Sequence, residues 1–180
     1  GRILAASSPT GPAFEGAQIN SGQRATPGAI ERVRINPENG KARFKVIGVD
    51  TWSDEEGFSD EIKKTGVTGI CGSGIIEVVA ELLLAKLMTA DGVIGGEGTN
   101  PSEYIEPDNR TFSYVLYRSP DGEKTISVTQ NDVRAVQLAK AALYAGVRLL
   151  MDYLETDQID SIKLAGAFGS HIDTTRATVL

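Results

Sequence analysis

The glycine-rich stretch GICGSG, residues 69–74, has the composition of a loop that could hold an anion. Gly69, Gly72 and Gly74 carry no side chain, so backbone N–H groups can approach a ligand closely there. The helix pattern that follows would direct its positive dipole end to the same place, which favours a phosphate. Dinucleotide and P-loop spacings are both absent, so the loop could equally serve to pack a helix against a sheet.

A second candidate is SIKLAGAFGSHID, residues 161–173, which is typical of a short apolar strand, a glycine turn and a helix. Gly166 and Gly169 would let a flat ring or its sugar lie against the backbone. His171 is the only histidine in the sequence. A lone histidine is more often structural than catalytic, and neither a serine nor a cysteine nucleophile with a plausible relay accompanies it.

Two further residues could do chemistry but favour simpler interpretations. Glu15 is the one acidic residue in the turn-rich stretch 6–30, and we interpret it as a solvated loop carboxylate. Cys71 stands at the mouth of a helix, where a thiol can become reactive, yet a resolving cysteine is missing, so a structural role is predicted. One cysteine cannot hold a structural zinc or an iron–sulfur cluster, which need about four ligands.

The elements that must position these residues follow from periodicity. After residue 74 one helix face is apolar, whereas Glu77, Glu81 and Lys86 lie off it. Residues 30–47 predict a hairpin with a solvated, basic face, and residues 111–128 predict a second hairpin around an SPDG turn. Between the elements lie an acidic connector at 52–64, with a turn or two of helix, and a glycine-containing loop at 91–107.

A long helix and an opening strand complete the expected elements. Thr129 and Asp132 form a capping-box pattern at the start of a helix of roughly 20 residues. One face of this helix is predicted to be buried core, on the spacing of Val136, Leu143, Val147, Leu150 and Leu154. Residues 2–6 predict a strand. Because the chain opens inside this strand without a methionine and stops inside a helix start, we expect a piece of a larger protein.

Composition excludes several classes of partner. The formal net charge is −6 and no strongly basic run occurs, so nucleic acid and anionic membrane are poor candidates. Charged residues interrupt the longest apolar stretch before it reaches membrane-spanning length, and no signal peptide is recognisable. A cytoplasmic location is the simplest expectation.

Four collinear blocks, which together span nearly the whole chain, resemble the ATP-dependent reductive activators of corrinoid proteins. The blocks are ASSPTGPAFEGAQI (6–19), GICGSGIIEVVAELL (69–83), VTQNDVRAVQLAKAALYAGV (128–147) and LAGAFGSHID (164–173). The resemblance implies an α/β fold, a partial actin-like (ribonuclease H-like) ATPase domain with a mixed sheet, flanking helices and hairpin insertions. Residues 1–180 would be a fragment of the C-terminal half of that domain, without the first lobe and the N-terminal ferredoxin-type domain.

The resemblance also implies a nucleotide site. LAGAFGS corresponds to the family's adenosine motif and would place Gly166, Ala167, Gly169 and Ser170 against the nucleoside. GICGSG would place Gly69, Gly72, Ser73 and Gly74 across the cleft, near the ribose and phosphates. The turn at 72–74 should then face an open cleft, and Gly74→Val should weaken ATP binding without unfolding. Catalytic residues remain unknown, and the residues that hold Mg²⁺ are expected before Gly1, so this chain is expected to supply no metal ligand.

Members of this family return cob(II)alamin to cob(I)alamin with ATP and an electron from a ferredoxin-type 2Fe–2S cluster. The implied partner is a corrinoid protein or a corrinoid-dependent methyltransferase. The fragment alone is expected to be inactive, and its missing strands to come from another chain or from self-association. Two alternatives stay open: a small-molecule kinase with the same fold, and a non-catalytic interaction module whose glycine loops serve only for packing.

Two residues depart from the family's pattern. Ala167 stands where glycine is common, a change that should still allow close approach. Lys86 stands after the central helix where related sequences have glycine, and a left-handed backbone there would cost about 1 kcal/mol.

Overall fold

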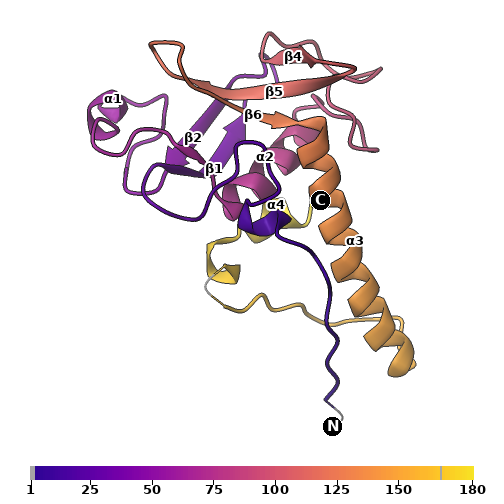
Figure 1. Ribbon diagram of the computed structural model, residues 1–180. Coiled ribbons are helices and arrows are strands. Elements are labelled where there is room, and N and C mark those ends of the chain that lie inside the picture. The colour runs from indigo at the N-terminus through magenta and orange to yellow at the C-terminus, as the bar shows by residue number, and fades with distance from the viewer. Residues whose placement is uncertain (1–2, 167) are drawn as a thin grey trace.

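The computed structural model describes residues 3–166 and 168–180. Its first sheet is mixed and has the order β2-β1-β3 (Figure 1). Strand β1 (Ala29–Ile35) runs antiparallel to β2 (Ala42–Val46) and parallel to the short β3 (Gly69–Ile70). The hairpin predicted at 30–47 and the mixed sheet of the predicted α/β class are therefore confirmed.

The second sheet is antiparallel, with the order β4-β5-β6, and lies at the top of the molecule in Figure 1. It comprises β4 (Ile105–Asp108), β5 (Thr111–Arg118) and β6 (Thr125–Thr129). The SPDG hairpin is thus confirmed, whereas β4 begins inside the stretch that was predicted to be loop. The buried hydroxyl of Tyr114 donates a 2.8 Å hydrogen bond to the Gly40 carbonyl, which ties this sheet to the β1–β2 turn.

Helix α2 (Gly72–Leu84) packs along β1 and buries both of its acidic residues, so the prediction that they lie off the buried face is wrong. The reason lies in the edge of β1. Along β1, the partners of β3 are Ala29 and Ile30, at the start of the strand. Farther along β1, Glu77 accepts a hydrogen bond from the backbone N–H of Val33 at 2.9 Å. Glu81 accepts one from Ile35, also at 2.9 Å.

The spacing of helix and strand explains this match. Four residues along a helix rise about 6.0 Å. Two residues along a strand span about 6.6 Å. Carboxylates at positions i and i+4 of α2 therefore reach alternate N–H groups of β1 and replace a neighbouring strand. Backbone donors that burial would otherwise leave unpaired are satisfied in this way.

The C-terminal end of α2 contains Lys86, one of the two departures from the family's pattern that were located in the sequence. Lys86 has φ +56°, the left-handed conformation that favours glycine. The N–H of Leu87 donates to the Leu82 carbonyl at 2.9 Å, and the N–H of Lys86 donates to Leu83 at 3.1 Å. These two bonds define a Schellman motif, so the left-handed backbone whose cost was considered from sequence is present at Lys86.

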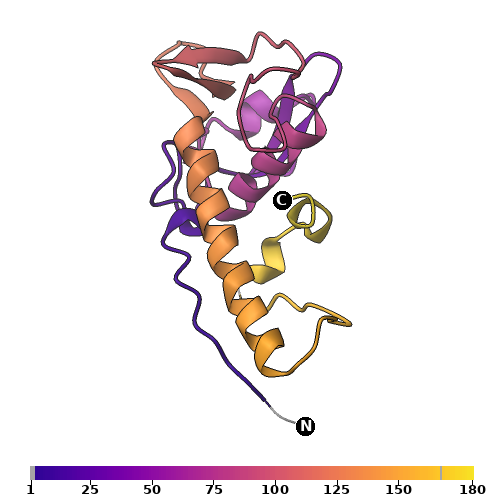
Figure 2. The same cartoon turned by 90° about the vertical axis from the view of Figure 1, so that its right-hand side faces the viewer.

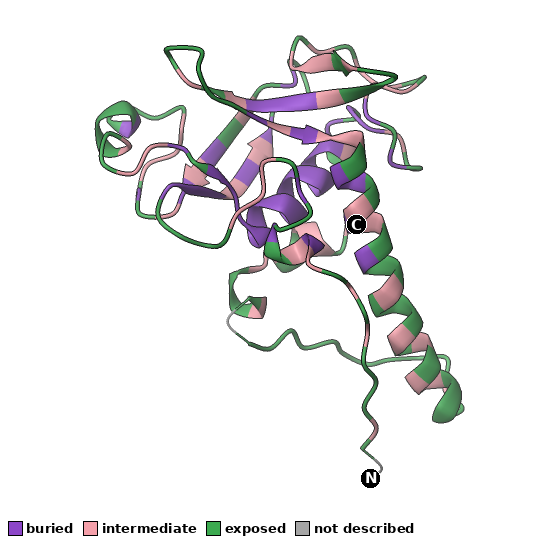
Figure 3. Ribbon diagram, in the orientation of Figure 1, coloured by how far each residue is buried: buried purple, intermediate pink, exposed green. Residues whose placement is uncertain are grey.

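Helix α3 (Gln130–Tyr153) begins at the predicted capping box, with Thr129 and Asp132 bonded to each other in both directions. Its first turns enter the core through Val133, Val136 and Ala139. The lower half extends away from both sheets and is largely exposed (Figures 2 and 3). The prediction of one continuous buried face is wrong there. Leu143 and Leu154 are both 45% exposed, because the described residues supply no layer to cover that half.

Short elements and irregular segments make up the remainder. They include the 3-10 turns η1 (Ala13–Glu15) and η2 (Gly169–His171) and the helices α1 (Phe58–Glu61), inside the acidic connector, and α4 (Thr174–Ala177). The strands predicted at 2–6 and before the Gly166 turn do not form in residues 3–6 or 161–165, since neither segment pairs with another strand. Residue 2 lies outside the described part. Within the described ranges, no helix has the length and apolar character needed to cross a membrane.

Candidate functional site

The first turn of α2 is formed by Gly72, Ser73 and Gly74, with Cys71 as the N-cap. N–H groups in the first turn of a helix have no partner within the helix. The Cys71 side chain does not cap them. The turn thus has the donors and the dipole direction that the sequence predicted for an anion site.

The same turn is buried, which contradicts the expected open cleft. A Cβ on Gly72 would lie 2.0 Å from the Phe14 carbonyl oxygen, and one on Gly74 would lie 2.3 Å from that of Ile30. Gly69 is similarly enclosed, with the Ser21 carbonyl oxygen 2.8 Å from a Cβ built there. The glycines of GICGSG are therefore required for packing against backbone, as in the alternative that sequence left open.

The second glycine segment is open. Gly166 is exposed, has φ +98°, and a Cβ built on it would meet nothing within 4 Å. Gly169 is half-buried against Leu164, and the exposed Ser170 donates its N–H to the Gly166 carbonyl at 3.1 Å. Ala167 lies outside the described residues. The predicted nucleoside side is accordingly accessible, whereas the predicted phosphate side is covered.

Two phenylalanines bring the separate blocks together. The rings of Phe14 and Phe168 stack with their centroids 6.4 Å apart and their planes at 30°. A Cβ on Gly72 would lie 2.6 Å from the ring of Phe168. The blocks 6–19, 69–83 and 164–173 thus meet at the N-terminus of α2, where Figure 1 places the indigo turn η1 close to α2 and α4.

An ion-pair network beside this junction was missed by sequence reasoning. Glu77, whose side chain is fully buried, binds Arg32 at 2.7 Å and Arg34 at 2.5 Å. Arg34 also binds Asp173 at 2.9 Å. The basic side chains of β1 were interpreted as a solvated sheet face. The alternation of Arg32 and Arg34 opposite acidic residues four apart was the signal that could have revealed the pairing.

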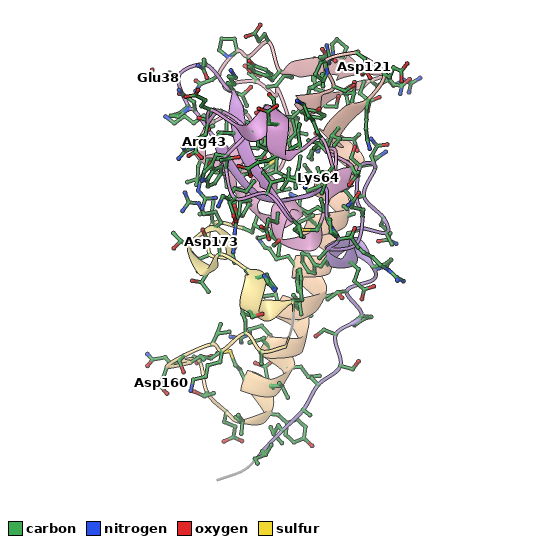
Figure 4. The ribbon with its side chains drawn as sticks, turned by 90° about the vertical axis from the view of Figure 1, so that its left-hand side faces the viewer. Glu38, Arg43, Lys64, Asp121, Asp160 and Asp173 are labelled. Atoms are coloured by element: carbon green, nitrogen blue, oxygen red, sulfur yellow. The ribbon has the colours of Figure 1, made fainter. Side chains whose placement is uncertain are left out.

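The network reaches the end of the chain through α4. Arg176 donates from Nε to Glu81 at 3.0 Å, and this carboxylate raises the pKa of Arg176. Burial alone would raise the pKa of Asp173, but the Arg176 backbone N–H and the charges of Arg176 and Arg34 outweigh it and lower that pKa. Figure 4 labels Asp173 where the yellow C-terminal segment meets the β1–β2 hairpin. Three arginines and three carboxylates balance one another across β1, α2 and α4.

The remaining candidate residues from the sequence are Cys71, Glu15 and His171. Cys71 is buried, with Sγ 3.4 Å from the Ile30 carbonyl oxygen and 3.3 Å from Ser73 Oγ, which fits the predicted packing role. Glu15 and His171 are exposed. No group of three or more His, Cys, Asp or Glu side chains suited to a metal ion occurs in the described part of the chain.

Two surface hollows lie elsewhere. The larger, about 440 Å³, lies between β2, α1 and the second sheet, with Phe44, Phe58 and Tyr117 among its walls. The smaller, about 360 Å³, lies beside Arg34 and Arg43. Neither of these two hollows is lined by a residue of the two glycine segments.

Comparison with known proteins identifies the family of this chain. Residues 1–180 match the family described as the C-terminal domain of RACo, the ASKHA domain. The chain belongs to this family. Among solved structures, the "Reductive activator for corrinoid,iron-sulfur protein" is similar at a TM-score of 0.73 and 32% identity, over 94% of this chain and 26% of that one. The partial actin-like fold predicted from sequence is thereby confirmed.

Two curated relatives resemble the RACo-type domain over almost all of its length. The "Corrinoid activation enzyme RamQ" of Eubacterium limosum is 40% identical over 98% of this chain and 28% of its own length. The "[Co(II) methylated amine-specific corrinoid protein] reductase" of Methanosarcina barkeri is 26% identical over 98% of this chain and 30% of its own length. The chain therefore spans less than a third of the relatives it matches.

Proposed function

We propose that this RACo-type domain is the C-terminal, ATP-binding part of an enzyme that returns the Co(II) corrinoid of a partner protein to Co(I). Family membership supports the proposal, as do the names of the relatives, which describe corrinoid activation and reduction. Those names favour this function over the small-molecule kinase considered from sequence. The observation that carries the nucleotide role is the meeting of the two glycine segments, where Phe168 lies against Gly72.

The residues present fit the nucleoside part of a nucleotide better than its phosphates. Gly166 offers an open backbone surface for a ring or sugar, with Gly169 and Ser170 beside it. The donors at 72–74 are buried, with the Phe14 backbone carbonyl and the Phe168 ring against Gly72, so a phosphate role there is supported by the helix dipole and not by an open cleft.

The electron and the metal ion would enter from outside these residues. Conversion of Co(II) to Co(I) needs one electron, and one cysteine is too few for the 2Fe–2S cluster expected to donate it. No candidate Mg²⁺ ligand cluster exists in the described residues. The partner is a corrinoid protein or corrinoid-dependent methyltransferase, and the 180 residues alone should be inactive.

A test of the nucleotide role uses a matched pair of glycine variants in the complete protein. Gly166→Val places a side chain on the open nucleoside surface, and Gly122→Val is the control. Both positions have positive φ, +98° and +75°, and both offer open space for a Cβ. Backbone strain is thus similar, and only the first should reduce ATP affinity in calorimetric titration and slow Co(I) formation from the Co(II) corrinoid protein. Equal affinities in the two variants would contradict the proposed site.

The uncovered half of α3 supports a role for additional strands. Ile162 is 74% exposed in the unpaired segment 161–165, and Leu149 is 60% exposed on α3. We expect strands from another chain, or exchange between copies, to cover this surface. Light scattering of the 180-residue chain should give a mass above that of a monomer, reduced by Ile162→Asp. A monomeric wild-type chain at high concentration would exclude self-association.

A further inference from the structure

The segment that carries the proposed nucleoside surface is held by charged side chains. Residues 166–170 lead within three positions to Asp173, which accepts hydrogen bonds from the N–H groups of Thr175 and Arg176 and so caps α4. Asp173 binds Arg34 of β1, and Arg176 binds Glu81 of α2. Three residues of chain span at most about 11 Å. Fixing Asp173 on β1 therefore restricts where the 166–170 turn can lie.

The side chains that join α4 to β1 and α2 are shielded from solvent. The side chain of Glu81 is 7% exposed, and those of Arg34 and Arg176 are both 25% exposed. Charge-assisted hydrogen bonds in such surroundings are stronger than those of an exposed pair, and the carboxylates of α2 are themselves fixed by backbone N–H groups of β1. The attachment points on β1 and α2 are therefore rigid, so α4 and the turn before it take their position from them.

We propose that Arg34, Asp173 and Arg176 are positioning residues that hold Gly166 and residues 168–170 beside the N-terminus of α2 and thereby set the affinity for the nucleotide. The inference rests on the proposed function, because the turn is its nucleoside surface. Phe168 is the contact that links the turn to α2, since its ring lies against Gly72 and stacks on the ring of Phe14. Loosening α4 should separate the two glycine segments without removing any group that touches the ligand.

The experiment compares Arg176→Ala, Arg176→Lys and Asp173→Asn with a control, Arg148→Ala, in the complete protein. Arg148 forms exposed pairs with Asp152 and Asp157, on the lower part of α3 and the loop after it. Hydrogen exchange without nucleotide reports the mobility of 166–176, and calorimetric titration reports ATP affinity. Arg176→Ala should speed exchange in that segment alone and weaken ATP binding roughly tenfold, the equivalent of one charge-assisted hydrogen bond. Arg176→Lys should restore part of the affinity, and Arg148→Ala should change neither quantity.

The outcomes separate the two proposals. If wild type binds ATP and the variants at 173 and 176 loosen the segment with unchanged affinity, the positioning role is overturned while the proposed function stands. Unchanged exchange in both variants also overturns it. A wild-type protein that binds no ATP overturns the proposed function and this inference together. Should Arg176→Ala unfold, the near-isosteric Asp173→Asn still decides, through the same two measurements.

Discussion

Arg176 donates from Nε to Oε1 of Glu81 at 3.0 Å, although 95 positions separate the two residues. The other oxygen of this carboxylate accepts from the backbone N–H of Ile35 at 2.9 Å. One side chain of α2 therefore completes the edge of β1 and anchors the C-terminal helix at the same time. Glu77 repeats the arrangement one helical turn earlier, with Val33, Arg32 and Arg34.

Glu77→Gln should destabilise the protein strongly. The substitution removes a fully buried charge that three donors share and leaves two arginines without their main partner. We expect a loss of about 2–4 kcal/mol in the free energy of unfolding by urea denaturation. The control Glu106→Gln breaks the exposed pair with Arg118 and should change stability by less than about 1 kcal/mol. Equal effects would show that burial does not strengthen the network.

Acidification should weaken the ion pairs that attach α4 to β1, because Asp173 becomes protonated. Its pKa is lowered in the folded protein, so its contribution is fully present above the ordinary value of 3.8 and is lost as pH falls through the folded value. Urea unfolding of wild type and Asp173→Asn over a pH series should show a difference that is largest near neutrality and shrinks below about pH 4.

The groups that face Asp173 do not change this direction. Arg34 and Arg176 stay charged throughout the acid range. Glu77 and Glu81 are present in both proteins, so the comparison isolates the carboxylate at position 173. A stability difference that remains constant at all pH values would contradict the assignment to Asp173.

Lys86→Gly should stabilise the protein by about 0.5–1 kcal/mol, because glycine adopts the left-handed backbone of the Schellman motif without strain. The gain is limited since glycine also has more freedom in the unfolded chain. Lys86→Ala removes the same side chain but keeps the strain, so it is the matched control and should give no gain. Thermal unfolding of the three proteins checks this, and an equal gain in both variants would assign the effect to the lysine side chain instead.

Gly74→Val should unfold or strongly destabilise the domain, contrary to the expectation from sequence that it would affect only ATP binding. The 2.3 Å approach of a Cβ to the Ile30 carbonyl oxygen leaves no space, and the opposing atom belongs to a buried strand. Even Gly74→Ala should cost about 1–3 kcal/mol. Circular dichroism and urea denaturation measure this, with Gly122→Ala as an exposed reference. A stable, folded Gly74→Val protein would show that α2 can shift away from β1.

Local elements were predictable because their signals lie within a few residues. The capping box of Thr129 and Asp132, the SPDG hairpin and the left-handed Lys86 all depend on hydrogen bonds or backbone angles set by near neighbours. The family was also predictable, since four collinear blocks are far more specific than one glycine loop. These parts needed no knowledge of which elements pack together.

Tertiary packing alone decided which faces were buried. Glu77 and Glu81 looked solvent-facing on the helix pattern, but β1 has unpaired N–H groups at the matching spacing, and only the packed arrangement brings the two together. Conversely, the apolar face of α3 predicted burial along its whole length, yet a helix face is buried only where another layer covers it. The same reasoning applies to the glycines at 72 and 74. The sequence determined that they carry no side chain, whereas the packing determined that neighbouring backbone, and not a ligand, occupies the space beside them.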